Sequence, residues 1–134
     1  MNYVFDACAL IAYVRGEPGN LVIEDILLDS RSTIAMHAIN ACEAYYDFVR
    51  TDRRGVADAV ISDSISAGVN ISEAIDAALW KAAGDLKAEL RRISLADAFA
   101  LAFSKRMDAT LVTSDHKEFD KLVDKGICKI LFIR

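Results

Sequence analysis

The chain has 134 residues, which is the length of one ordinary domain with a single core. A hydrophobic fraction of 54% and a single Pro exclude a disordered chain, and no apolar run is long enough to span a membrane. The formal net charge of −4 has the wrong sign for holding nucleic acid by bulk electrostatics, although bound cations can offset the acids locally in a nucleic-acid enzyme.

The three cysteines, Cys8, Cys42 and Cys128, are odd in number and form no CxxC pair. We therefore expect reduced thiols rather than a disulfide framework or structural zinc. The first residues lack the basic segment and apolar run of a secretory signal peptide. A single domain over residues 1–134, located in the cytoplasm, is the resulting expectation.

The chain begins with a short β-forming run, Tyr3 to Phe5, that ends at Asp6. A helix is predicted over residues 7–14 and, after a turn with Pro and two glycines, a largely buried amphipathic helix over 21–28. In an open parallel sheet the chemistry lies beyond the carboxyl ends of the strands. Asp6 has this position on what we interpret as a central strand; alternatively, it only caps the next helix.

A second strand is predicted over residues 32–36 and a helix over 37–49. The apolar stripe of this helix is predicted to comprise Ile39, Cys42, Tyr46 and Val49. Glu43 lies beside the stripe, and a carboxylate is rarely buried unless it is paired or bound to a cation. Glu43 either reaches water or faces a site, where Asn40, one turn earlier, is placed to orient it.

Two further helices are expected, over residues 56–67 and from Ser72 to about Arg92. The first ends at Gly68, a suitable residue just beyond a helix, and a short edge strand is predicted at 69–71 between them.

The apolar run from Ile93 to Phe103 contains one charge, Asp97. A helix that is apolar on all sides is buried, so Asp97 is expected inside the protein or in a cleft. Ser94 and Asp97 also fit a capping box, and the two interpretations are compatible.

The last part of the chain repeats the pattern seen at Asp6. A strand over residues 109–113 is followed by Asp115, again at a strand's carboxyl end. Asp115 is alternatively the N-cap of a helix over 116–125, with Glu118 three residues later. Residues 128–133 are predicted to form the final strand.

These four acids are predicted to converge at one end of the sheet. Asp6 and Asp115 end strands that we expect to be neighbours, and Glu43 and Asp97 lie on helix faces that pack on the sheet. Two carboxylates about 4 Å apart repel by roughly 4 kcal/mol at an effective dielectric near 20, so the cluster takes up protons or binds a cation. Oxygen ligands favour Mg²⁺ or Mn²⁺, which are often held with substrate phosphates; this indicates phosphate-ester chemistry.

Four segments carry a resemblance to a known family: Val4-Phe-Asp6 with Ala9-Leu-Ile11, Asn40-Ala-Cys-Glu43, Leu95-Ala-Asp97-Ala98, and Val112-Thr-Ser-Asp115 with Phe119. In this order, over nearly the whole chain, they resemble the acidic motifs of PIN-domain ribonucleases, most closely the VapC-type toxins of prokaryotic toxin–antitoxin modules. The resemblance implies a three-layer α/β/α sandwich with a central parallel sheet and Mg²⁺- or Mn²⁺-dependent endonucleolytic cleavage of RNA. It also implies a homodimer and inhibition by a cognate antitoxin protein.

The same resemblance assigns the catalytic and metal-binding roles to Asp6, Glu43, Asp97 and Asp115. Thr113 or Ser114 matches a supporting hydroxyl position of the family. Many members carry another acid between the fourth Asp and the Phe, a position for which this chain offers only Glu118.

Two groups of side chains have roles that the sequence leaves open. Four basic residues either contact RNA phosphates or are ordinary solvated charges: Arg15, Arg53, Arg54 and Lys117. Four aromatic residues are candidates for stacking on bases, pairing subunits or packing in the core: Tyr13, Tyr45, Tyr46 and Trp80.

Two other functions remain alternatives. Phe5-Asp6-Ala-Cys8 resembles the strand end that carries the nucleophilic Asp in phosphatases of the haloacid dehalogenase type, but that chemistry needs a Lys and a cap domain. A non-catalytic regulatory or interaction domain, such as a receiver-like fold, would use the acids only as helix caps, and Lys129 is poorly placed for the Lys that receivers need. The presence of all four acids in order favours the nuclease.

Overall fold

A five-stranded sheet forms the middle layer of the computed structural model, which describes residues 1–134. All neighbouring strands are parallel, and their order across the sheet is β3-β2-β1-β4-β5. The strands are β1 (Asn2–Phe5), β2 (Thr33–His37), β3 (Val69–Ser72), β4 (Thr110–Thr113) and β5 (Ile130–Phe132).

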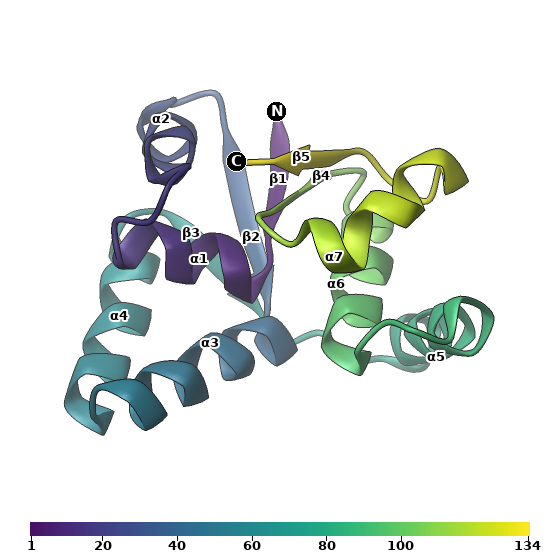
Figure 1. The fold of residues 1–134 in the computed structure, drawn as a ribbon, viewed down its shortest axis with the longest axis horizontal. Coiled ribbons are helices and arrows are strands. Elements are labelled where there is room, and N and C mark those ends of the chain that lie inside the picture. The colour runs from purple at the N-terminus through teal and green to yellow at the C-terminus, as the bar shows by residue number, and fades with distance from the viewer.

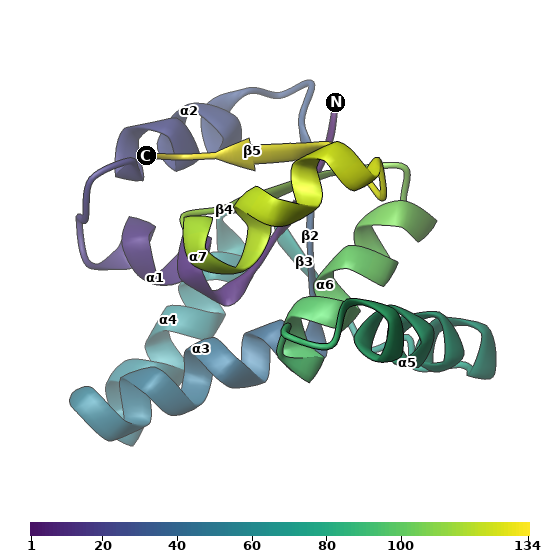
Figure 2. The same cartoon turned by 45° about the vertical axis from the view of Figure 1, so that its right-hand side comes forward.

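Helices cover both faces of the sheet (Figure 1). They are α1 (Ala7–Val14), α2 (Asn20–Leu28), α3 (Ala38–Thr51), α4 (Arg54–Ser66), α5 (Ala77–Leu90), α6 (Leu95–Arg106), the single turn α7 (His116–Phe119) and the 3₁₀ helix η1 (Asp120–Lys125). Helices α1 to α4 share one hydrophobic core with the sheet, whereas α5 and α6 share a second core on the other face. Helix α5 lies against α6 in both ribbon views (Figure 2).

Strand β1 is central and buried on both faces. Val4 contributes to the core under α5 and α6, and Phe5 contributes to the core under α1 to α4. A strand covered on both faces reads as a continuous apolar run, which is the pattern that predicted it. The fold is therefore the predicted three-layer α/β/α arrangement.

Neighbouring strands β1 and β4 end side by side. Phe5 is in register with Val112, and the amide N–H of Asp6 donates to the Val112 carbonyl at 3.2 Å. The prediction that Asp6 and Asp115 follow adjacent parallel strands is confirmed. Because β1 lies between β2 and β4, the order also differs from the 2-1-3-4-5 sheet of receiver domains, which contradicts the receiver-like alternative.

Two helices bury other side chains than those predicted. Helix α2 is not largely buried, because it packs on α1 through a narrow stripe and buries only Ile23 and Ile26. Helix α3 begins one residue late, since His37 ends β2 and caps the helix by accepting a hydrogen bond from the Ile39 N–H. The side chains it buries are not the predicted stripe; they are Asn40, Ala41, Ala44 and Phe48.

The helix predicted from Ser72 begins later. Ser72 is the last residue of β3, paired in register with His37, and the true N-cap of α5 is Asp76, which accepts from the Leu79 N–H at 3.0 Å. The Ala74 carbonyl in between accepts a hydrogen bond from His37 instead of a helix N–H.

The remaining elements mostly follow their predictions. The edge strand β3 and the helix end before Gly68 are confirmed. The predicted 116–125 helix is one α-turn followed by η1, and the last strand shortens to Ile130–Phe132. All three cysteines are free, and no helix is both long and apolar enough to cross a membrane.

Candidate active site

Asp6 and Asp115 are held rigidly at the carboxyl ends of β1 and β4. The Asp6 Oδ1 atom accepts a hydrogen bond from the Ala9 N–H at 2.8 Å, and the Asp115 Oδ1 atom accepts one from the Glu118 N–H at 3.0 Å. Each acid therefore caps the helix that follows it. Asp6 is only 2% exposed, which is unusual for a residue that serves only as a cap.

Asp97 and Glu43 come to the same region from two helices. The backbone N–H of Asp97 donates to Ser94 Oγ at 3.0 Å, so the first turn of α6 is capped as predicted. Asp97 is 8% exposed within a helix whose next seven residues are all buried. Glu43 is half-buried on α3, which extends from the carboxyl end of β2 and contacts both α1 and α6 (Figure 1).

We call the space between these elements the acidic cleft. It has a volume of about 290 Å³ and is lined by residues from α1, α3, α6 and the start of α7. Five of its lining residues are acids and none is basic; the acids are Glu43, Asp47, Asp97, Asp115 and Glu118. Asp6 lies behind this lining, beside the buried hydroxyl of Thr113.

The carboxylates raise one another's pKa. Burial raises the pKa of Asp6 to about 7, with further contributions from Asp97 and Glu43. Burial likewise raises the pKa of Asp97 to about 6, helped by Glu43, Glu118 and Asp115. The pKa of Glu43 is also raised, first by burial and then by Asp115 and Asp47. These acids therefore share one electrostatic environment, which favours protons or a cation.

An exposed carboxylate elsewhere in the chain shows the opposite behaviour. Asp76 accepts two hydrogen bonds of 2.7 Å from the guanidinium of Arg106, which holds its pKa well below the usual range. No comparable cation lines the acidic cleft. Among the cleft acids only Asp47 has a cation, since it pairs with Arg15 at 3.2 Å and with Arg50 at 2.8 Å. A buried charge normally has a partner, so the other four acids of the lining lack the positive charge that their burial favours.

The donor set fits a hard divalent cation. Five carboxylates line the cleft, and Glu118 Oε2 is buried with no hydrogen-bond partner. However, no three Asp, Glu, His or Cys side chains are arranged as a closed metal site. For the four acids to hold one ion, their carboxylates would have to lie closer together than they do in this structure.

Asn40 has a different partner from the one predicted. Its Nδ2 donates to the Ala96 carbonyl at 3.1 Å, rather than to Glu43, and its Oδ1 is buried without a partner. Ala96 directly precedes Asp97, so this hydrogen bond joins α3, which carries Glu43, to α6 next to Asp97. The sequence signal was a polar residue in the first turn of a helix, but the direction of its side chain depended on the true buried face of α3.

The structure also shows the surroundings of the predicted supporting hydroxyl and of the basic residues that were candidates for phosphate contacts. Thr113 is fully buried and accepts from the Asp115 N–H at 3.0 Å, so Thr113 rather than Ser114 lies between Asp6 and Asp115. Arg15 is paired with Asp47 and Asp52 and lies over the Phe48 ring, so it is committed to contacts within the chain. The other candidate phosphate contacts are exposed; these are Arg53, Arg54 and Lys117.

The sequence did not single out Asp47 as a cleft residue, and it offered Glu118 only through the family resemblance. Asp47 lies four residues after Glu43 on α3, and Glu118 lies three residues after Asp115. Helical spacing was the available signal, because residues three or four apart share a face.

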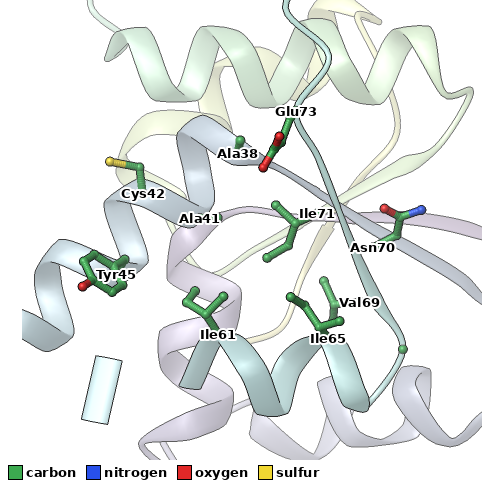
Figure 3. A pocket seen from close by; sticks show the side chains of 11 residues that line it. Ala38, Ala41, Cys42, Tyr45, Ile61, Ile65, Val69, Asn70, Ile71 and Glu73 are labelled. Atoms are coloured by element: carbon green, nitrogen blue, oxygen red, sulfur yellow. The ribbon is translucent and has the colours of Figure 1, made fainter. Parts of the chain in front are cut away.

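A second, larger cavity lies on another side of α3 (Figure 3). We call it the apolar groove; its volume is about 760 Å³, and it lies between α3, α4 and the edge strand β3. Figure 3 shows Ile61, Ile65 and Ile71 converging from α4 and β3, with Cys42 and Tyr45 on α3. Glu73 is the only charged residue in its lining, so the groove has no group of side chains suited to acid–base or metal chemistry.

The sequence model of the PIN domain family matches residues 3–125. The chain belongs to the PIN domain family. No curated protein sequence matches this PIN domain, but solved structures resemble it, and its structural neighbours are VapC toxins of VapBC toxin–antitoxin systems.

Three of these structures show how far the similarity extends. VapBC2 from Rickettsia felis, bound to a promoter DNA fragment, has 20% sequence identity and a TM-score of 0.76 over 98% of both chains. A toxin–antitoxin complex from Klebsiella pneumoniae has 20% identity and a TM-score of 0.72 over 98% of both chains. VapC20 from Mycobacterium tuberculosis, a toxin that cleaves the sarcin–ricin loop, has 14% identity and a TM-score of 0.69, covering 91% of this chain and 95% of its own. At these identities the similarity establishes the fold.

Proposed function

We propose that this PIN domain is a divalent-metal-dependent endoribonuclease and the toxin of a toxin–antitoxin pair. The observation that carries the proposal is the acidic cleft, where Glu43, Asp97 and Asp115 line one cavity in front of the buried Asp6 and none of the four pairs with a cation. Burial and neighbouring carboxylates raise the pKa of Asp6, Asp97 and Glu43. Members of the PIN and VapC family are typically metal-dependent nucleases, which supports assigning the cleft to phosphodiester hydrolysis.

In this proposal the four acids hold Mg²⁺ or Mn²⁺. A divalent ion there supplies positive charge that offsets the carboxylates, polarises the scissile phosphate and lowers the pKa of water. Asp6 and Asp115 contribute ligand oxygens whose positions are fixed by the hydrogen bonds that cap α1 and α7. Glu43, which makes no hydrogen bond that fixes its carboxylate, is free to adjust to the ion and the substrate.

The chain's own residues also prepare the site before substrate arrives. Thr113 bonds the Asp115 backbone and stabilises the charged form of Asp6, whereas Ser94 fixes the first turn that carries Asp97. RNA phosphates meet carboxylates in the cleft, so they are repelled until cations are bound. Contacts that draw RNA toward the protein must therefore come from outside the lining; Lys117, two residues after Asp115, is the nearest candidate in sequence.

The haloacid-dehalogenase-type alternative has less support. It needs a Lys beside the nucleophilic Asp, and no Lys lines the acidic cleft. Asp6 is also buried beneath the lining rather than presented to a substrate. A nucleophile must reach the atom it attacks, whereas a metal ligand needs only to reach the ion.

We further propose a cognate antitoxin and a homodimer as the protein's assembly partners. Neighbours in structure include toxin–antitoxin complexes from Klebsiella pneumoniae and Rickettsia felis, which supports an antitoxin partner.

The test is cleavage of single-stranded RNA by the purified chain with Mg²⁺ or Mn²⁺, and with a chelator. We expect cleavage that requires the metal and is abolished in Asp97→Asn. Glu73→Gln, which removes the one charge of the apolar groove, is the matched control and should cleave like wild type. Equal cleavage by folded Asp97→Asn, or cleavage that persists in chelator, would contradict the proposal.

A further inference from the structure

Tyr46 is an exposed aromatic residue that lines the acidic cleft. It lies on α3 with 55% of its surface exposed. Glu43, Tyr46 and Asp47 all line the cleft, at the i, i+3 and i+4 spacing of one helix face. Three residues of helix rise by about 4.5 Å, so Tyr46 lies just under one turn along α3 from Glu43.

The other aromatic candidates have different surroundings. Tyr13 and Tyr45 are half-buried and pack against the core under α1 to α4. Trp80 is 49% exposed, but it lies on α5, with Lys81 over its ring, and does not line the acidic cleft. Tyr46 is therefore the only aromatic residue of the chain that is both exposed and part of the cleft lining.

The charge of the cleft limits how RNA can be held there. Its side chains include five carboxylates and no Lys or Arg, and the two arginines that contact a lining acid, Arg15 and Arg50, are both paired with Asp47. Affinity beside the reacting phosphate must then come from bound cations and from contacts that carry no charge. Stacking of an unpaired base on an aromatic ring is such a contact, and it is the main way in which proteins hold single-stranded RNA.

We propose that Tyr46 stacks on a base of single-stranded RNA next to the phosphate held at the acidic cleft. This inference rests on the proposed nuclease function. It specifies the substrate as an unpaired RNA segment in which a base can unstack from its neighbours. The ring acts as a substrate-binding surface and takes no part in proton transfer. It selects unpaired over double-stranded RNA, because a base within a helix presents no free face.

The experiment compares Tyr46→Leu, Tyr46→Phe and wild type in cleaving a short random-sequence single-stranded RNA with Mn²⁺. Leu keeps apolar bulk without a π face, and Phe keeps the ring without the hydroxyl. Trp80→Leu is the matched control, since it removes an exposed aromatic residue from a helix outside the cleft. Circular dichroism verifies the fold of each variant, and sedimentation gives its oligomeric state.

We expect Tyr46→Leu to raise KM by about 5- to 10-fold, the lower part of the range for one stacked base, with kcat changed by less than about 2-fold. Tyr46→Phe and Trp80→Leu should resemble wild type. The salt dependence of KM should have the same slope in Tyr46→Leu and wild type, because stacking releases no counterions. Lys117→Ala, which removes a candidate phosphate contact, should instead reduce that slope.

Two results would overturn the inference while leaving the proposed function intact. The first is a wild-type KM in folded Tyr46→Leu. The second is loss of activity because Tyr46→Leu breaks a dimer, which would assign the ring to a protein–protein contact. Anisotropy of a labelled RNA separates these results from failure of the proposed function, since wild type that neither binds nor cleaves RNA overturns both.

Discussion

The acidic cleft and the apolar groove lie on two sides of the same helix. Helix α3 presents Glu43, Tyr46 and Asp47 to the cleft, and Ala41 and Tyr45 to the groove. The groove, at about 760 Å³, is more than twice as large as the cleft, at about 290 Å³. A large apolar cavity is a usual first candidate for an active site. Here the smaller cavity contains the perturbed acids.

The comparison shows that the volume of a cavity and the chemistry of its lining depend on different features of the fold. The groove exists because β3 is an edge strand and the α3–α4 pair leaves its apolar flank uncovered. The cleft exists because two strand ends and two helices bring acids together in a partly desolvated place. Desolvation and like charge shift pKa values at reactive sites, and the groove has no cluster of titratable side chains on which they could act.

The largest difference between the two cavities should appear when one acid is neutralised in each. We predict that Asp97→Asn lowers metal-dependent RNA cleavage by at least about 100-fold, because loss of a ligand costs more than loss of the groups that support it. Glu73→Gln, at the groove, should retain wild-type activity. Initial rates at saturating Mn²⁺ measure both, and similar losses in the two variants would remove the distinction between the cavities.

The second prediction concerns pH. Asp6 has a pKa of about 7 in the folded protein and an ordinary value of 3.8, so between these values the folded state binds the extra proton. The free energy of unfolding of metal-free protein therefore falls as pH rises from about 4 to 7.

Asp6→Asn, which keeps a cap acceptor for α1, should lack this part of the decline. Between about pH 4 and pH 7, wild type should therefore lose roughly 2–4 kcal/mol of unfolding free energy relative to the variant. Urea denaturation at several pH values measures it. A wild-type stability that rises with pH relative to the variant would show that Asp6 is charged and paired.

A third prediction compares a polar residue beside the acidic cleft, Asn40, with one at the apolar groove, Asn70. Asn40→Ala removes the hydrogen bond to the Ala96 carbonyl and should cost about 1–3 kcal/mol of unfolding free energy. It should also weaken Mn²⁺ binding by roughly 10-fold, because α3 and α6 carry Glu43 and Asp97. Asn70→Ala, at the rim of the groove and exposed, is the control and should change neither quantity. If Asn40→Ala lowered stability with unchanged Mn²⁺ affinity, Asn40 would be structural only.

The smallest effect is expected in the groove itself. Ile65 is 54% exposed, so Ile65→Ser should change the unfolding free energy by no more than about 0.5 kcal/mol. RNA cleavage and KM should stay at wild-type values, because the residue lies outside the acidic cleft. An increased KM in this variant would show that the groove belongs to the RNA-binding surface.

The sequence was most informative where a backbone pattern fixed a side chain's position. Asp6 and Asp115 were predicted to be neighbours because each follows a short apolar strand, and parallel strands end at one edge of a sheet. Asp97 was predicted to be buried because its helix is apolar on all sides. For Asp6 and Asp115 the capping alternative was also correct, and the cap is part of how each acid is held.

Prediction was least successful on α3, where several faces of one helix have different neighbours. The helix contacts α1, α4, α6 and the sheet, so a single apolar stripe did not identify its buried side. Tyr46 was placed in that stripe but is exposed, whereas Asn40 is buried. Amphipathic spacing reports one buried face, and it cannot reveal which polar residues meet a neighbouring helix.

The central claim is that the acids of the cleft form a divalent metal site, and calorimetry with Mn²⁺ tests it most directly. Wild type and Glu73→Gln should bind Mn²⁺ with equal affinity, and folded Asp97→Asn should bind at least about 10-fold more weakly. Because the pKa of Asp6 is raised to about 7, binding should release more protons at pH 6 than at pH 8, measured from buffers that differ in ionisation enthalpy. Equal binding by all three proteins, or none by wild type with RNA present, would contradict the claim.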